Sequence, residues 1–133
     1  MGAGLVHVVS TPSNRDTLLS ALPEILFSTR EEIKKVLPLA SAVVIGPGIG
    51  LSKQSEELVE YVLANTKVPT VVDGDAITIC AKKDITFRDN FVLTPHVKEM
   101  SVLTGIPIPK LQEDILGTTK NTAKTRNCIL VQK

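Results

Sequence analysis

Short runs of hydrophobic residues alternate along the chain with stretches that have helical periodicity. Residues 42–45 and 128–131 are apolar at every position, a pattern typical of strands buried on both faces of a parallel sheet. Further runs with strand character lie at residues 5–9, 25–27, 68–72 and 91–93. Strands that alternate with helices predict parallel pairing with right-handed crossovers. We therefore expect an α/β fold, an open and mainly parallel sheet with helices on both faces.

Helical patterns follow most of these runs. They lie at residues 15–20, 31–37, 51–62, 76–83, 97–103 and 111–123. Ser28-x-x-Glu31 and Thr29-x-x-Glu32 are two overlapping capping boxes that predict a helix start, and Pro38 predicts the end of that helix. Thr94 and Pro95 predict the N-cap and first position of another helix. The pattern from residue 111 to 123 is weaker, because a glycine interrupts it.

Size and composition restrict the functions open to the chain. Its 133 residues fit one α/β domain, and a net charge of +1 without a basic stripe disfavours nucleic-acid binding. Cys80 and Cys128 lie far apart without a metal-binding spacing, so we interpret both as small buried residues. No apolar run is long enough to span a bilayer, which favours a cytoplasmic protein without a membrane partner.

Three turns with different chemistry follow three of the expected strands. They are Gly-Pro-Gly-Ile-Gly at residues 46–50, Asp-Gly-Asp at residues 73–75 and Thr-Pro-His at residues 94–96. In an open parallel sheet, ligands bind outside the carboxyl ends of the strands. We therefore expect these turns to line one pocket for a small phosphorylated or polyol-bearing ligand.

The glycine turn matches neither the P-loop nor the dinucleotide fingerprint. Glycines after a buried strand allow a ligand to approach the backbone, and the helix expected near Ser52 offers free N–H groups to an anion. A tight turn that requires glycine and binds nothing fits the motif equally well.

The other two turns carry titratable side chains. We expect Asp73 to face the pocket and Asp75 to cap the following helix, and Mg²⁺ held through phosphates stays open. His96, in the first helical turn, would carry a neutral imidazole, and Glu99 would lie one turn further on. His7, inside an apolar strand, is interpreted as a satisfied core residue. No metal-ligand cluster and no nucleophile elbow are present in the sequence.

Four motifs in a fixed order resemble a known family. Ala-Gly-Leu-Val at residues 3–6, Val-Val-Ile-Gly-Pro-Gly-Ile-Gly at 43–50, Pro-Thr-Val-Val-Asp-Gly-Asp-Ala at 69–76 and Leu-Thr-Pro-His-Val-Lys-Glu-Met at 93–100 span nearly the whole chain. Together they resemble the ADP- or ATP-dependent NAD(P)H-hydrate dehydratases, a branch of the ribokinase-like superfamily.

The resemblance implies a repair enzyme that dehydrates hydrated NADH or NADPH through a phosphorylated intermediate, with ADP or ATP as co-substrate and Mg²⁺ as a candidate metal. It implies that the glycine turn and the Thr-Pro-His segment lie on the hydrate-binding side, where His96 would orient the substrate. The substrate-binding positions expected from the resemblance and the turns are Gly46, Gly48, Gly50, Asp73, His96, Val97, Lys98, Glu99, Met100, Ser101 and Val102. Lys133 would match a lysine of the family's nucleotide-binding turn. We expect NAD(P)H hydrate and an adenine nucleotide as ligands, and a homo-oligomer as the assembly.

The chain also departs from the family pattern. Family members continue past the strand at residues 129–131 into a Lys-Gly turn and a Gly-Thr-Gly-Asp anion hole, whose aspartate has no counterpart here. We therefore expect a central, partial ribokinase-like domain over residues 1–133 that is inactive alone and contains no catalytic residue of its own. Two alternatives stay open: a ribokinase-like kinase for a vitamin precursor, and a non-catalytic nucleotide-binding module.

Overall fold

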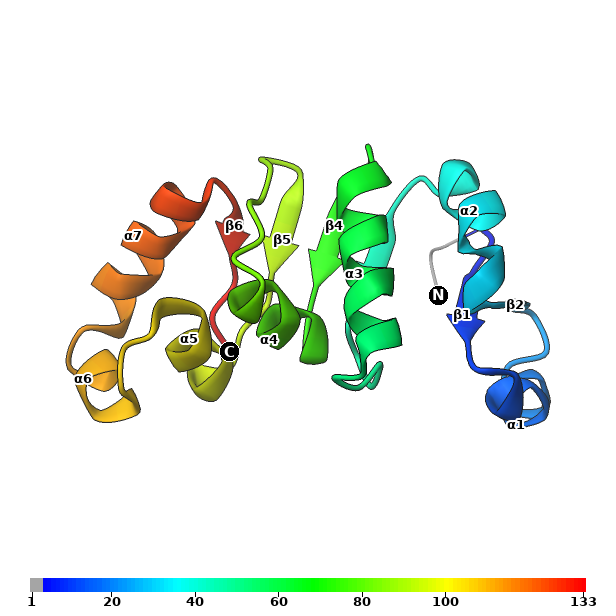
Figure 1. The fold of residues 1–133 in the computed structure, drawn as a ribbon, viewed down its shortest axis with the longest axis horizontal. Helices are drawn as coiled ribbons and strands as arrows, with labels where there is room; N and C mark the ends of the chain where they lie inside the picture. Colours follow the sequence, from blue (N-terminus) through cyan, green and yellow to red (C-terminus); the bar gives the residue numbers. More distant parts are fainter. Residues whose placement is uncertain (1–3) are drawn as a thin grey trace. The chain divides into compact units, whose positions relative to one another are not determined.

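The computed structural model describes residues 4–133, so Ala3 of the first family motif lies outside the described residues. The chain divides into two compact units, one ending at Ala40 and the other comprising Ser41–Lys133. Figure 1 shows the elements of both units in sequence colours. Each unit is described by itself below.

The first unit contains a two-stranded parallel sheet. Strand β1 (His7–Ser10) pairs with β2 (Leu26–Thr29), with His7 opposite Leu26 and Ser10 opposite Thr29. The connecting and following elements are η1 (Pro12–Asn14), α1 (Arg15–Ala21), η2 (Arg30–Glu32), α2 (Ile33–Val36) and η3 (Leu37–Leu39). The helix expected at residues 15–20 is therefore confirmed, and both strands begin one or two residues later than expected.

Side chains of this unit bear on four sequence predictions. Thr29 and Glu32 form the expected capping box, in which the backbone N–H of Thr29 donates to Glu32 Oε2 at 2.9 Å. The overlapping box at Ser28 is wrong, because Ser28 belongs to β2 and its hydroxyl bonds His7 Nε2 at 2.8 Å. That bond gives His7 a polar partner, as expected, but His7 is only partly buried, so the expectation that it is a core residue is wrong. Pro38 ends the α-helix but is itself part of a 3₁₀ turn.

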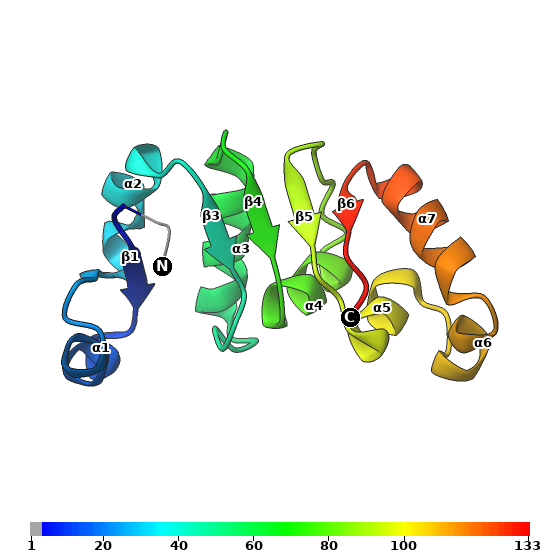
Figure 2. The same cartoon turned by 180° about the vertical axis from the view of Figure 1, so that it is seen from behind.

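The second unit is a four-stranded parallel sheet in the order β3-β4-β5-β6. Its strands are β3 (Val43–Ile45), β4 (Thr70–Val72), β5 (Phe91–Leu93) and β6 (Ile129–Leu130). Its helices are α3 (Lys53–Asn65), α4 (Asp75–Lys82), α5 (Val97–Thr104), α6 (Ile108–Glu113) and α7 (Ile115–Arg126). Helices α3 and α4 lie on one face of the sheet, and the strands come to the front when the view is turned by 180° (Figures 1 and 2).

The core of the second unit lies between the sheet and these helices. The row formed by Ile45, Val72 and Leu93 is buried, and Val59 of α3 and Ile77 of α4 are completely buried. Cys80 and Cys128 are also buried, as expected. Burial raises the pKa of the Cys80 thiol to about 12 and that of the Cys128 thiol to about 11, so neither is a reactive thiolate.

The opposite row of side chains is more open. Val44, Val71, Val92 and Ile129 pair in register across the four strands. Val44 is 68% exposed and Ile129 54% exposed, whereas the two central valines are partly buried. The expectation that residues 42–45 and 128–131 are buried on both faces is therefore wrong for these two side chains, which lie on the edge strands of this sheet, and also for Ala42 and Val131, which are exposed.

One predicted helix is two helices. The pattern at residues 111–123 is divided between α6 and α7, and Asp114 lies between them. The Asp114 carboxylate caps α7 by accepting the Gly117 N–H at 2.9 Å. A Cβ on Gly117 would lie 2.1 Å from that carboxylate, so glycine makes this close cap possible. The residue that weakens the helical pattern is thus part of a helix start.

Candidate functional site at the carboxyl edge of the sheet

The glycine turn after β3 combines left-handed backbone with close packing. Gly46, Gly48 and Gly50 have φ values of 124°, 65° and 74°, which L side chains rarely adopt. Gly46 is pressed against the next turn, because a Cβ there would lie 1.7 Å from the Asp73 carbonyl oxygen. The neighbourhood of Gly48 and Gly50 is open, with nothing within 4 Å of the position a Cβ would take. A ligand can therefore approach the backbone at the second and third glycines.

Helix α3 starts directly behind this turn, as expected. Ser52 is its N-cap, and its hydroxyl accepts the Ser55 N–H at 3.2 Å. Ser55 Oγ donates in turn to the Ile49 carbonyl at 2.6 Å, which fixes the end of the glycine turn to the first turn of the helix. The turn is thus held at both ends, by Gly46 packing and by the serine pair.

The aspartate turn after β4 is joined to the glycine turn. Asp75 Oδ2 accepts the Gly50 N–H at 2.9 Å. The expectation that Asp75 caps α4 is wrong, because Gly74 occupies the N-cap position and Asp75 is the first helical residue. Its carboxylate satisfies a backbone donor of another turn, 25 residues away in sequence.

Asp73 forms an ion pair with Lys133, a residue 60 positions away in sequence. Lys133 Nζ lies 2.6 Å from Asp73 Oδ1, with the two side chains 48% and 28% exposed. The Lys133 ammonium, assisted by the Thr94 hydroxyl and the backbone of Gly74, holds the pKa of Asp73 below its usual 3.8. Asp73 follows Val71 by two residues, so it continues the open row of side chains toward the carboxyl edge.

The residues after β6 bring Lys133 to this edge. The Val131 N–H donates to the Leu93 carbonyl at 2.9 Å, and the Lys133 N–H donates to the Pro95 carbonyl at 3.0 Å. Gln132 Nε2 also donates to the Pro95 carbonyl, at 3.1 Å, while its buried Oε1 has no partner among the described residues. Gln132 was not singled out from the sequence, and Pro95 was singled out only as a helix start and as part of the Thr-Pro-His turn. The strand predicted at residues 128–131 is the signal that could have located both, because pairing of that strand with residues 91–93 brings Gln132 next to Pro95.

His96 is the N-cap of α5, which corrects the prediction that Thr94 caps this helix and Pro95 begins it. Its Nδ1 accepts the N–H groups of Lys98 at 3.1 Å and Glu99 at 3.2 Å. Both carboxylate oxygens of Glu99 lie close to His96: Oε2 accepts the His96 backbone N–H at 2.9 Å, and Oε1 lies 3.1 Å from His96 Nε2. The pair is a capping box built on histidine.

The remaining predicted site residues belong to α5 and differ in accessibility. The Met100 side chain is fully buried in the core, and Ser101 Oγ donates to the Ile106 carbonyl at 2.6 Å. Lys98 and Val102 are exposed, and Val97 is partly buried. Gly105 ends the helix in the left-handed conformation.

These contacts place the predicted turns at one edge of the sheet. The glycine turn touches the aspartate turn through Gly46 and Asp75, and Asp73 reaches the Pro95 segment through Lys133. His96 follows Pro95 directly. The edge therefore carries backbone amides, one ion pair and a capped imidazole within a single connected cluster.

Two further observations limit what the edge can hold. No group of three or more His, Cys, Asp or Glu side chains within residues 4–133 could hold a metal ion. Asp73 already has a cation partner, so a divalent ion here would draw its ligands mainly from phosphate oxygens. No helix in the described part of the chain is long and apolar enough to cross a membrane.

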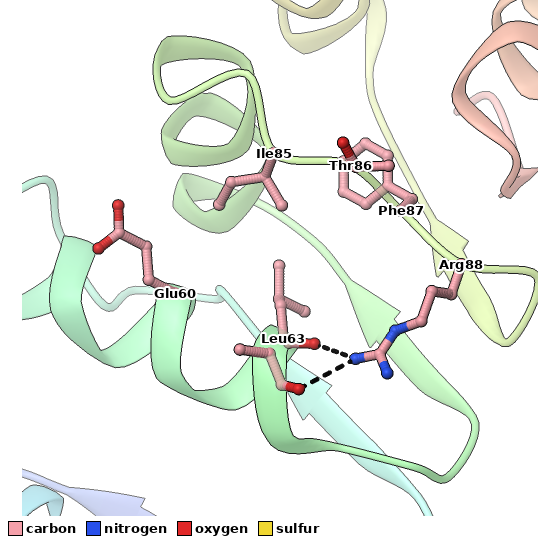
Figure 3. A pocket seen from close by; sticks show the side chains of 7 residues that line it. Glu60, Leu63, Ile85, Thr86, Phe87 and Arg88 are labelled. Atoms are coloured by element: carbon pink, nitrogen blue, oxygen red, sulfur yellow. Dashed lines mark hydrogen bonds between the residues drawn. The ribbon is translucent and has the colours of Figure 1, made fainter.

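A shallow depression lies at the opposite edge of the same sheet (Figure 3). It has a volume of about 390 Å³ and lies between the end of α3 and the segment before β5, with Leu63 and Phe87 among its lining residues. Arg88 crosses its rim and donates to the carbonyls of Leu63 and Ala64 at the end of α3. Its guanidinium is therefore used to cap a helix, and the depression offers mainly apolar walls.

Solved structures place the fold in a known class. A ribokinase-like superfamily protein from Enterococcus faecalis superposes with a TM-score of 0.90 at 27% identity, covering 99% of this chain and 48% of that one. An ADP/ATP-dependent NAD(P)H-hydrate dehydratase from Bacillus subtilis, co-crystallised with ATP and Mg²⁺, gives a TM-score of 0.81 at 24% identity and supports the fold alone. The protein thus has the ribokinase-like α/β fold, which confirms the predicted fold class.

The sequence comparisons identify the family within that class. The Carb_kinase family model, described as NAD(P)H-hydrate dehydratase, matches residues 1–133, so the chain belongs to this family. It is 38% identical to the ADP-dependent (S)-NAD(P)H-hydrate dehydratase of Streptococcus pneumoniae, over 99% of this chain and 47% of that protein. It is also 38% identical to the enzyme of the same name from Lactiplantibacillus plantarum, of which it covers 46%. The chain spans about half the length of these curated relatives.

Proposed function

We propose that this chain supplies the hydrate-binding part of a nucleotide-dependent NAD(P)H-hydrate dehydratase, a lyase that restores damaged nicotinamide nucleotides. The observation that carries the proposal is the connected cluster at the carboxyl edge, in which the glycine turn, Asp73 and the Pro95–His96 segment meet. Family membership over all 133 residues supports the same reaction class. One partial ribokinase-like domain over residues 1–133 is part of the proposal.

The proposed roles follow from what each group leaves available. The open backbone at Gly48 and Gly50 would receive the hydrate closely, and residues 96–102, apart from the buried Met100, would line the other side. Asp73 would act through its ion pair, and Lys133 would face the phosphates of ADP or ATP. Mg²⁺, when bound, would shield the charge on those phosphates. Transfer of a phosphoryl group to the hydrate and elimination of phosphate would complete the reaction.

We infer a cytoplasmic homo-oligomer that binds neither nucleic acid nor membranes. The net charge of +1 supports the absence of nucleic-acid binding, since the chain cannot neutralise many phosphates of a polynucleotide.

The experiment is a calorimetric titration with NADH hydrate of the native chain and two variants. Gly48→Ala places a methyl group in the open space of the glycine turn and should weaken binding about tenfold or more, a loss of about 1.4 kcal/mol. Thr86→Arg alters the depression at the opposite edge and should leave the affinity unchanged. A loss of affinity in Thr86→Arg but not in Gly48→Ala would move the site to the depression.

Turnover is measured in the same preparation by adding ADP or ATP and following the return of NADH absorbance. The prediction is binding without turnover by this chain alone. A stable phosphate ester in place of restored NADH would instead support a small-molecule kinase.

A further inference from the structure

The His96–Glu99 pair fixes how the imidazole can be used. Nδ1 receives two backbone N–H groups, at 3.1 and 3.2 Å, so this nitrogen carries a lone pair and no proton. The remaining proton is on Nε2, which lies 3.1 Å from Glu99 Oε1. The two hydrogen bonds accepted by Nδ1 therefore define one neutral tautomer, with the proton on Nε2 and the Glu99 carboxylate beside it.

Glu99 is placed to enforce this arrangement. Only 9% of Glu99 is exposed; its Oε2 accepts the backbone N–H of His96, and its Oε1 lies 3.1 Å from the ring Nε2. A carboxylate this close to Nε2 favours a proton there over a lone pair, and the other tautomer is costly because Nδ1–H would face two backbone donors.

The accessible part of His96 is then carbon surface. The side chain is 51% exposed, yet Nδ1 is occupied by two backbone donors and Nε2 lies beside the Glu99 carboxylate, both within the first turn of α5. What stays available to a ligand is the face of the ring and its C–H edge. Such a surface suits stacking against another ring or packing against an apolar group.

We propose that Glu99 is a positioning residue that locks His96 in the Nε2–H tautomer, so that His96 contacts a ring of the bound nicotinamide nucleotide by its face instead of exchanging a proton. The part of this inference that concerns the ligand rests on the proposed function. The part that concerns the tautomer does not.

The tautomer is tested first, without any ligand. Long-range ¹H–¹⁵N spectra of the native chain should show one pyrrole-type and one pyridine-type nitrogen in His96, with its signals assigned by their loss in His96→Asn. In Glu99→Gln one carboxylate oxygen becomes an amide donor, so the two nitrogen shifts should move toward the average of both tautomers. An averaged or Nδ1-protonated ring in the native chain would overturn the inference.

Glu32→Gln is the matched control, since it weakens the same kind of capping box at Thr29, where no imidazole takes part. It should lower the melting temperature without shifting the His96 nitrogens. Equal shifts in Glu32→Gln and Glu99→Gln would mean that the spectra report general loosening, and would refute a specific role for Glu99.

The mode of contact is tested by two replacements of His96. Asn keeps a capping oxygen but loses the ring, whereas Phe keeps the ring face but loses both nitrogens. Face contact predicts that His96→Phe binds NADH hydrate within about threefold of the native chain and His96→Asn at least about tenfold more weakly. The reverse order would show that a nitrogen makes the contact. If the native chain binds no hydrate, the proposed function and the ring contact fail together, while the spectra still decide the tautomer.

Discussion

Replacing Gly46 with alanine tests the packing between the first two turns. The φ of 124° is a conformation that alanine rarely adopts, and strain of this kind costs about 1–3 kcal/mol. The new Cβ would also lie 1.7 Å from the Asp73 carbonyl oxygen and 2.8 Å from the Ala76 Cβ, so backbone must move. Overpacking typically costs a further 1–3 kcal/mol, which gives a total of about 2–6 kcal/mol.

Gly48→Ala is the matched control for this substitution. Its φ of 65° is also left-handed, but nothing lies within 4 Å of the added methyl group. The strain alone should cost about 1–2 kcal/mol. The difference between the variants, about 2 kcal/mol, isolates the contact between the turns and corresponds to about a 30-fold change in the folded-to-unfolded ratio.

The assay is urea unfolding of both variants and the native chain, followed by circular dichroism at one temperature. An unchanged dependence on urea concentration would show that the variants expose the same surface on unfolding. If the free energies of unfolding of Gly46→Ala and Gly48→Ala agree within about 0.5 kcal/mol, the packing argument for Gly46 is refuted, because differences of that size are expected even between independent sites.

Three other substitutions or conditions give sharp expectations. Because the folded pKa of Asp73 is lowered, its ion pair stabilises the fold above the unfolded pKa and is lost as pH falls through the folded value; Lys133→Met should flatten acid unfolding below about pH 4, and an unchanged acid limb would contradict this. Cys80 and Cys128 should react slowly with a disulfide reagent at pH 8 in the folded chain and fully in urea. At that pH only about 1 in 10,000 Cys80 side chains and about 1 in 1,000 Cys128 side chains are thiolates in the folded chain. Rapid labelling of the folded chain would argue against burial. Thr29→Ala should cost about 1 kcal/mol in thermal unfolding, and no loss would mean that its cap is unimportant.

The strands and most turns could be predicted because their signals are local. Glycines after an apolar run, a Gly105 stop and the Thr29-x-x-Glu32 spacing each concern residues within one turn of each other. The start of α5 was misplaced by two residues, because Thr and Pro are common at helix starts and His96 is not a typical N-cap. Glu99 lies three residues after His96, and that spacing is the signal that would have identified the true capping box.

What could not be predicted depends on residues far apart in sequence. Asp75 is a residue type that often caps helices, and only the fold brings the Gly50 N–H to its carboxylate. Asp73 and Lys133 are 60 residues apart, and no periodicity relates them. The exposure of Val44 could not be predicted either, because a run that is apolar at every position has no alternation to indicate which face of the strand is exposed.

The bond between Asp75 and the Gly50 amide constrains the evolution of the glycine loop. Surface loops usually tolerate insertions and deletions. Here the first glycine is anchored beneath a carbonyl and the last must meet a fixed carboxylate, so the number of residues between them is set. A gain or loss of one residue would detach the loop at one end, and natural variation in this segment should therefore change residue type and preserve length.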